Sequence, residues 1–450
     1  MANHPPSNQF YPQPGFAPRA ASQIRFKKRY LGPILASAFI VEGLVVKSFV
    51  FTGNDPIILH YAASTLLCGA IILYLLVRKA LTNLSVFQMV LLGAALSWSI
   101  VSSINSDRIE NLVASITFGL AFFTAYIAVP RLFERTNTSL ENVIRSLLIA
   151  FTVISLVMAI LFPSLATDAG SGRFSGAAIS VAVACNMFFF STVVFAFSAR
   201  AASNTRDRIL YVALTLAAFG MLYITYTRSL LVLTTFCLFI ILITNKNGYL
   251  VTRNLFIAAL IGLSIAGVGL AYEAVFGFDY EQLLINLRLI DGASVTTSRD
   301  TNWAFAIQRI SDEPLFGEGM LTKQTAGGFN SLDIETAAGY AVTYDPHSVI
   351  LSFGVQAGVP FAFFMTSFFV LVFATHLYKF GFSPSLASAP FMVGFFNFVT
   401  MIFSGGDLTS MGSSVDRFNM LFIGIIGYNA MFTPAPKSKK VYYGQSNGKR

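Results

Sequence analysis

Three arginines and one histidine stand at the ends of long apolar segments or between them, where charged side chains are costly and tend to be functional. They are Arg173, Arg228, Arg299 and His347. A guanidinium fork suits phosphate oxygens. An imidazole, with an ordinary pKa of about 6.5, accepts a proton at neutral pH. Together these side chains predict anion binding combined with general-base chemistry.

Two of the arginines lie in motifs that favour an anion site. Arg173 lies in Gly-Ser-Gly-Arg-Phe-Ser-Gly, where glycines let backbone N–H groups approach a ligand, and an apolar segment follows. Arg228 lies in the hydroxyl-rich Thr-Tyr-Thr-Arg-Ser, on a short link between two apolar segments. Other interpretations stay open: a flexible loop whose arginine reaches to water, and an interfacial anchor formed with Tyr223 and Tyr226.

Arg299 opens a segment with helical periodicity. One face of this segment carries Trp303, Ala306, Ile307 and Ile310. Arg299 projects near Trp303, four residues later. A Pro-Leu-Phe-Gly-Glu-Gly turn containing Gly317 and Gly319 follows. The alternative interpretation is an amphipathic helix lying on the membrane surface.

His347 follows Pro346, which suits the first position of a helix, and Asp345, which suits the N-cap. A structural or solvated histidine is the alternative. Glu42 is a further, weaker functional candidate because carboxylates inside a membrane are costly. The three cysteines lie inside apolar segments, and no Cys/His spacing fits a metal site or a disulfide framework.

Composition identifies the elements that must position these residues. The 450 residues are 55% hydrophobic and 11% charged, less than half the charged fraction of about 25% in soluble domains. This excludes a soluble enzyme, a disordered chain and a disulfide scaffold. The net charge of +9 does not indicate nucleic-acid binding, because the basic residues form short clusters between apolar segments.

The sequence predicts an all-α polytopic membrane protein with about 12 transmembrane helices, each close to the 20 residues that cross a bilayer. The predicted spans are 31–51, 57–77, 84–103, 111–130, 143–162, 177–197, 209–226, 229–244, 255–276, 358–377, 386–404 and 418–433. Of the 30 basic residues, 21 fall in the tails and alternate connections, which predicts that both termini are cytoplasmic.

The connection at residues 277–357 is too long to be a simple loop, and it has a helical pattern and aromatic residues. We therefore expect a folded, partly helical periplasmic loop. The predicted organisation is a disordered cytoplasmic tail (1–30), transmembrane helices 1–9 (31–276), the large periplasmic loop (277–357), transmembrane helices 10–12 (358–433) and a basic cytoplasmic tail (434–450).

Taken as an ordered set, these motifs resemble the O-antigen ligase and Wzy-type polysaccharide polymerase superfamily, including its exopolysaccharide polymerases. Arg299, Trp303, the glycine turn and His347-Ser348 carry the strongest likeness. The sequence departs from the family at Ser348, where many members have asparagine or another small residue.

The resemblance implies a metal-independent, inverting glycosyltransferase without a cofactor, in the bacterial inner membrane, with its active site facing the periplasm. Arg173, Arg228 and Arg299 would bind the diphosphate of an undecaprenyl-diphosphate-linked glycan. His347 would be the catalytic base, and Trp303, Gly317 and Gly319 would support the site. Implied partners are donor and acceptor glycans, the bilayer, and flippase and chain-length regulator proteins.

Three functions remain open at this point. They are a polymerase that joins lipid-linked repeat units, an O-antigen ligase that transfers glycan to lipid A core, and a transporter of polysaccharide or lipid-linked glycan. The candidate residues lie at the outer boundary and no internal repeat is evident, which favours an enzyme over a transporter.

Overall fold

The computed structural model describes residues 31, 34–35, 37–39, 55–77, 86–106, 109–133, 140–167, 173–178, 181–225, 227–243, 296–320, 334–335, 341–342, 348–380, 389–404 and 420–427. The predicted span 255–276, both tails, Glu42 and His347 lie outside these residues.

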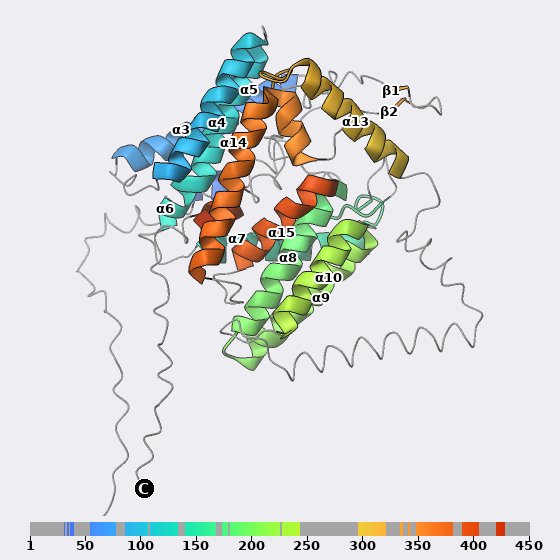
Figure 1. Ribbon diagram of the computed structural model, residues 1–450. Helices are drawn as coiled ribbons and strands as arrows, with labels where there is room; N and C mark the ends of the chain where they lie inside the picture. Colours follow the sequence, from blue (N-terminus) through green and yellow to red (C-terminus); the bar gives the residue numbers. More distant parts are fainter. Residues whose placement is uncertain are drawn as a thin grey trace, which may run out of the picture.

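The described residues form a helical assembly with one small hairpin (Figure 1). Its first part comprises α3 (Asp55–Val77), α4 (Val86–Asn105), α5 (Ile109–Phe123), the π-helix η1 (Thr124–Ala128), α6 (Val129–Phe133) and α7 (Leu140–Leu161). The second part comprises α8 (Val181–Ala201), α9 (Thr205–Ile224), α10 (Arg228–Ile243), α13 (Thr296–Asp312), the paired strands β1 (Ile334–Glu335) and β2 (Ala341–Val342), α14 (Val349–Phe380) and α15 (Ala389–Ser404). Residues 420–427 are also helical.

Five of these helical stretches are long and apolar enough to cross a membrane. They are Asn111–Leu132, Leu140–Leu161, Val183–Ala201, Thr205–Ile224 and Val349–Tyr378. Apolar side chains on α9, such as Ile209 and Leu216, are mostly exposed, which suits a surface that faces lipid. The helical membrane architecture is confirmed, whereas the count of 12 spans and the large periplasmic loop stay predictions.

Hydroxyl groups join the helices of the first part. The Thr65 and Thr117 hydroxyls are 2.9 Å apart between α3 and α5, and the Ser103 and Ser115 hydroxyls are 2.5 Å apart between α4 and α5. Ser115 also donates to the carbonyl of Ser99 at 3.1 Å. Small hydroxyl residues let helices approach closely and bond across the interface in an apolar environment.

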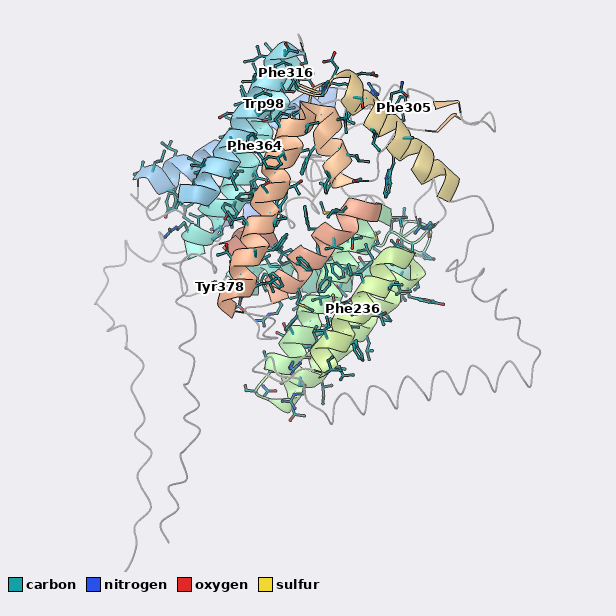
Figure 2. All side chains as sticks on the ribbon, in the orientation of Figure 1. Trp98, Phe236, Phe305, Phe316, Phe364 and Tyr378 are labelled. Atoms are coloured by element: carbon teal, nitrogen blue, oxygen red, sulfur yellow. The ribbon has the colours of Figure 1, made fainter. Side chains whose placement is uncertain are left out.

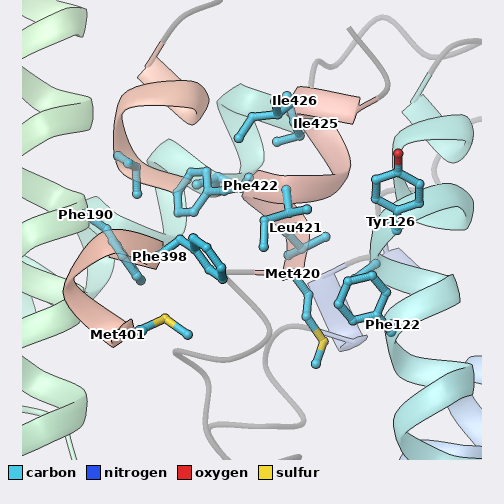
Figure 3. Close-up of a cluster of buried hydrophobic side chains, with 14 of the residues drawn as sticks. Phe122, Tyr126, Phe190, Phe398, Met401, Met420, Leu421, Phe422, Ile425 and Ile426 are labelled. Carbon is cyan, nitrogen blue, oxygen red and sulfur yellow. The ribbon is translucent and has the colours of Figure 1, made fainter. Parts of the chain in front are cut away.

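The helix at 420–427 packs between the two sides of the core (Figure 3). On one side it meets η1, where a Cβ at Gly424 would overlap the backbone of Ala125 and one at Gly427 would overlap the ring of Tyr126. On the other side, the rings of Phe422 and Phe190 lie 5.3 Å apart. Glycine therefore permits the close approach that links α5 and η1 to α8.

The most consequential feature of the fold is that α14 bends back on itself. The break lies at Ala357 and at Gly358, whose φ of 79° is unfavourable for other residues. The rings of Phe353 and Phe369 are 6.5 Å apart, although 16 residues of straight helix span about 24 Å. In Figure 1 the two segments meet at the top of the molecule as an inverted V. Residues 349–356 thus re-enter the bundle, and residues 359–378, about 30 Å long, can cross a bilayer.

Candidate functional site

The turn at residues 314–319 caps the break in α14. A broken helix exposes carbonyl groups before the break and N–H groups after it, and these need partners. The N–H of Glu318 donates to the carbonyl of Val355 at 2.8 Å, and the N–H of Gly319 donates to the backbone carbonyl of Gln356 at 2.9 Å. The N–H of Val359 donates to the carbonyl of Pro314 at 2.8 Å. The turn therefore supplies both the donors and the acceptor that the break requires.

Helix α4 holds this turn in place from the other side. Trp98 donates from Nε1 to the carbonyl of Leu315 at 2.9 Å, and Ser102 donates to the carbonyl of Phe316. The rings of Trp98 and Phe316 are stacked 5.7 Å apart (Figure 2). We call this assembly the clamp; it consists of residues 314–319, the break in α14, Trp98 and Ser102. It ties the segment that carries Arg299 to the helix that follows His347.

Two glycines of the turn lie where a larger residue would collide with neighbouring helices. Gly317 has a φ of 63°, and a Cβ there would lie 2.7 Å from the nitrogen of Gly358 and 2.8 Å from that of Ala357. Gly319 has a φ of 105°, and a Cβ there would overlap the side chain of Asn111 on α5. Gly317 and Gly319 thus support the clamp, since other residues would separate the turn from α14 and α5.

Replacing Gly358 with alanine is expected to destabilise the protein by roughly 2–4 kcal/mol. The positive φ is unfavourable for alanine, and the new Cβ would overlap the carbonyl of Leu315. Thermal unfolding of the detergent-solubilised protein measures the effect. The matched control is Gly220→Ala in α9, where a Cβ meets nothing within 4 Å and helix propensity favours alanine. Equal melting temperatures for the two variants would contradict this account of the clamp.

Helix α13 packs against α14 with part of its predicted apolar face. Ala306 is buried beside Val355, and a Cβ on Gly354 would meet the side chain of Ile310. Ile307, on the same predicted face, is 55% exposed. Ile307 is exposed because α13 contacts only the short segment of α14 before its break. This contact buries a single row of side chains along α13. The backbone of Arg299 lies in the first turn of α13, at the end remote from the clamp; its side chain lies outside the described part.

The clamp end of α13 is acidic. Arg309 forms an ion pair with Glu318 and lies over the ring of Phe305. The pKa of the Glu318 carboxyl lies above its usual value. Burial is the largest cause, and the neighbouring Glu313 and Asp312 add to it, whereas Arg309 lowers the pKa. An anionic ligand would be repelled here and favoured at the opposite end, where Arg299 and the positive pole of the helix lie.

Arg173 is fixed to the turn between α9 and α10. Its Nε donates to the carbonyl of Thr225 at 2.8 Å, and its Nη2 donates to the same carbonyl and to the Thr227 hydroxyl at 3.0 Å. The neighbouring Phe174 forms a β-bridge with Thr167 and stacks on Phe188. Residues 173–178 are thereby held against α7 and α8. Residues 174–178 are not helical, so Arg173 does not stand directly before α8.

Arg228 is the first residue of α10. The N–H of Leu231 donates to the carbonyl of Thr227 at 3.1 Å, which makes Thr227 the N-cap residue. The structure therefore brings Arg173 to the start of the helix on which Arg228 stands, where the helix dipole favours an anion. The side chain of Arg228 lies outside the described residues. The Thr225 hydroxyl donates to the carbonyl of Leu222 at 2.7 Å and so terminates α9.

The segment next to His347 can be located through Ser348. Ser348 is buried, and its carbonyl accepts from the N–H of Ser352 at 2.8 Å. Helix α14 begins at Val349, so Ser348 occupies the N-cap position that the sequence suggested for Asp345. Serine is among the residues that favour this position.

Comparison with known proteins finds one family that part of the chain resembles. Residues 212–366 match the family model described as O-antigen ligase. This segment is similar to O-antigen ligases. The match confirms, over this segment, the resemblance drawn from the motifs. No curated protein matches the chain.

The matching segment, residues 212–366, runs from α9 into α14. It contains Arg228, Arg299, Gly317, Gly319 and His347. Arg173 lies outside it, yet its hydrogen bonds to the α9–α10 turn join it to this segment. Trp98, Ser102 and Asn111 also lie outside it and contact the turn at 314–319. Sequence reasoning missed these three residues, since nothing local distinguishes them from other residues of apolar helices.

Proposed function

We propose that this protein is a membrane glycosyltransferase that polymerises undecaprenyl-diphosphate-linked oligosaccharide repeat units at the periplasmic face during exopolysaccharide biosynthesis. The observation that carries the proposal is the placement of the arginines. Arg228 and Arg299 stand in the first turns of helices, and Arg173 is bonded to the turn that precedes Arg228. Helix N-termini and guanidinium groups both favour phosphate oxygens.

The proposed reaction is a single inverting displacement. An acceptor hydroxyl oxygen attacks the anomeric carbon of the donor glycan and forms the new glycosidic bond. The bond between that carbon and the diphosphate oxygen breaks, so undecaprenyl diphosphate leaves with the electron pair. His347 takes the proton of the acceptor hydroxyl. No oxidant, reductant or cofactor is needed to balance this step.

The arginines would act on the charge that develops on the leaving diphosphate. Donors fixed in position before the reaction lower the barrier by several kcal/mol in comparable sites. The hydrogen bonds of Arg173 to Thr225 and Thr227 hold its guanidinium at the α9–α10 turn. The acidic clamp end of α13 disfavours binding there, which supports placing the diphosphate toward Arg299.

The proposed partners follow from this chemistry. The polyisoprenoid tail would lie along exposed apolar helix surfaces within the bilayer, and flippase and chain-length regulator proteins would act before and during polymerisation. The proposed location is the bacterial inner membrane, with both termini in the cytoplasm.

An O-antigen ligase is the second candidate, favoured by the description of the matching family. A ligase and a polymerase share the donor and differ in the acceptor. A deletion strain of the source organism distinguishes them. Loss of exopolysaccharide with normal lipid A core supports the polymerase, whereas unmodified lipid A core with normal exopolysaccharide supports the ligase and contradicts our proposal.

A further inference from the structure

The re-entrant segment of α14 carries a row of neutral polar side chains. Ser348, Ser352 and Gln356 follow one another at intervals of four residues, which places them on one face of the helix. Each is at most 4% exposed. The other sides of this segment are apolar: Val355 packs against α13, and Phe353 contacts the second segment of α14.

Two atoms of this row lack hydrogen-bond partners among the described residues. They are Oγ of Ser352 and Oε1 of Gln356, on side chains that are each 1% exposed. The Gln356 amide nitrogen makes one long bond, 3.5 Å to the carbonyl of Met320. A buried polar atom without a partner costs free energy, so its retention calls for an explanation. A ligand that bonds these atoms when it is bound provides one.

The chemistry of the row selects the class of ligand. A hydroxyl and a carboxamide can each donate and accept hydrogen bonds, as sugar hydroxyls also do. A diphosphate would instead require cations or several N–H donors. Trp303, on the helix packed against α14, also has an indole N–H without a partner among the described residues. The row begins at the residue that follows His347, so the proposed catalytic base is its neighbour in the sequence.

We propose that Ser352 and Gln356 bind hydroxyl groups of the glycan part of the lipid-linked substrate, on the re-entrant segment of α14. The inference rests on the proposed function and adds to it residues that recognise sugar, separate from those that recognise diphosphate.

The test compares binding of two lipids to the purified full-length protein. One is the lipid-linked repeat unit extracted from cells that lack this protein, and the other is undecaprenyl diphosphate without sugar. Kd values come from the rise in melting temperature with lipid concentration. Ser352→Ala and Gln356→Met are each expected to raise the Kd for the glycan-bearing lipid roughly 3- to 10-fold and to leave that for undecaprenyl diphosphate unchanged.

The melting temperature of each variant without lipid shows whether Ser352 and Gln356 recognise the glycan or only stabilise the fold. Ser352→Ala removes only an unpartnered hydroxyl and is expected to leave this temperature unchanged or to raise it. Gln356→Met also removes the long bond to Met320 and is expected to lower it slightly. Ser191→Ala is the matched control, because the Ser191 hydroxyl on α8 is also buried without a partner among the described residues. This control is expected to keep wild-type Kd values for both lipids.

Several outcomes would overturn the inference. They are wild-type Kd values for the glycan-bearing lipid in both variants, lowered melting temperatures with unchanged binding, and an equal loss of binding for both lipids. Failure of the proposed function looks different: the wild-type protein would bind the glycan-bearing lipid but form no glycosidic bond.

Discussion

Replacing His347 with alanine is expected to lower the rate of glycosidic bond formation by roughly 10²- to 10⁴-fold, the usual contribution of a general base. The variant is expected to insert into the membrane and to melt near the wild-type temperature, because α14 begins at Val349 and Ser348 occupies its N-cap. Polymer length on a gel and the initial rate with purified lipid-linked donor are the measurements.

The matched control for His347 is His4→Ala, in the predicted disordered tail, which is expected to retain the wild-type rate. The pH dependence adds a second readout. The wild-type rate should rise with pH as the base loses its proton, and the residual rate of the variant should lack this rise. Polymer of normal length from His347→Ala would refute the assignment of this residue as the base.

Replacing Arg173, Arg228 or Arg299 singly with lysine is expected to lower the rate by roughly 10²- to 10³-fold, as for the loss of one fixed donor in other sites. Lysine keeps the charge but lacks the planar fork. Arg173→Lys has a further consequence, because lysine lacks the second nitrogen, Nε, with which the guanidinium also bonds the carbonyl of Thr225. Rates and Kd values for undecaprenyl diphosphate are the measurements.

Arg145→Lys is the matched control for the arginines. Arg145 is partly exposed on α7, bonds the side chain of Asn142 at 2.6 Å, lies over the ring of Tyr211 and is on the predicted cytoplasmic side. It is expected to retain wild-type activity. Wild-type rates in all three variants at the proposed site would mean that the diphosphate binds elsewhere.

Much of the helical framework was predictable, because apolar runs of about 20 residues leave few alternatives in a bilayer. The span predicted for 143–162 corresponds to α7 (Leu140–Leu161), and that for 209–226 corresponds to α9 (Thr205–Ile224). The re-entrant course of α14 was not predictable in this way. Gly358 and Pro360 mark a break in the sequence, but the direction of the chain after a break depends on what packs against it.

The clamp shows why the site was only partly predictable. Glycines in a Pro-Leu-Phe-Gly-Glu-Gly turn indicate tight backbone geometry, but not what the turn touches. Its partner Trp98 is 217 residues away from Leu315. The spacing of Ser348, Ser352 and Gln356 was visible in the sequence, yet it has meaning only once residues 349–356 are known to be a buried helix.

The central claim is that this protein forms glycosidic bonds rather than moving glycans across the membrane. The most direct test supplies the purified protein in lipid vesicles with undecaprenyl-diphosphate-linked repeat units and no ion gradient. We predict longer lipid-linked glycan together with one free undecaprenyl diphosphate for each bond formed. Transfer of intact repeat units across the vesicle membrane without any new bond would contradict the account and indicate a transporter.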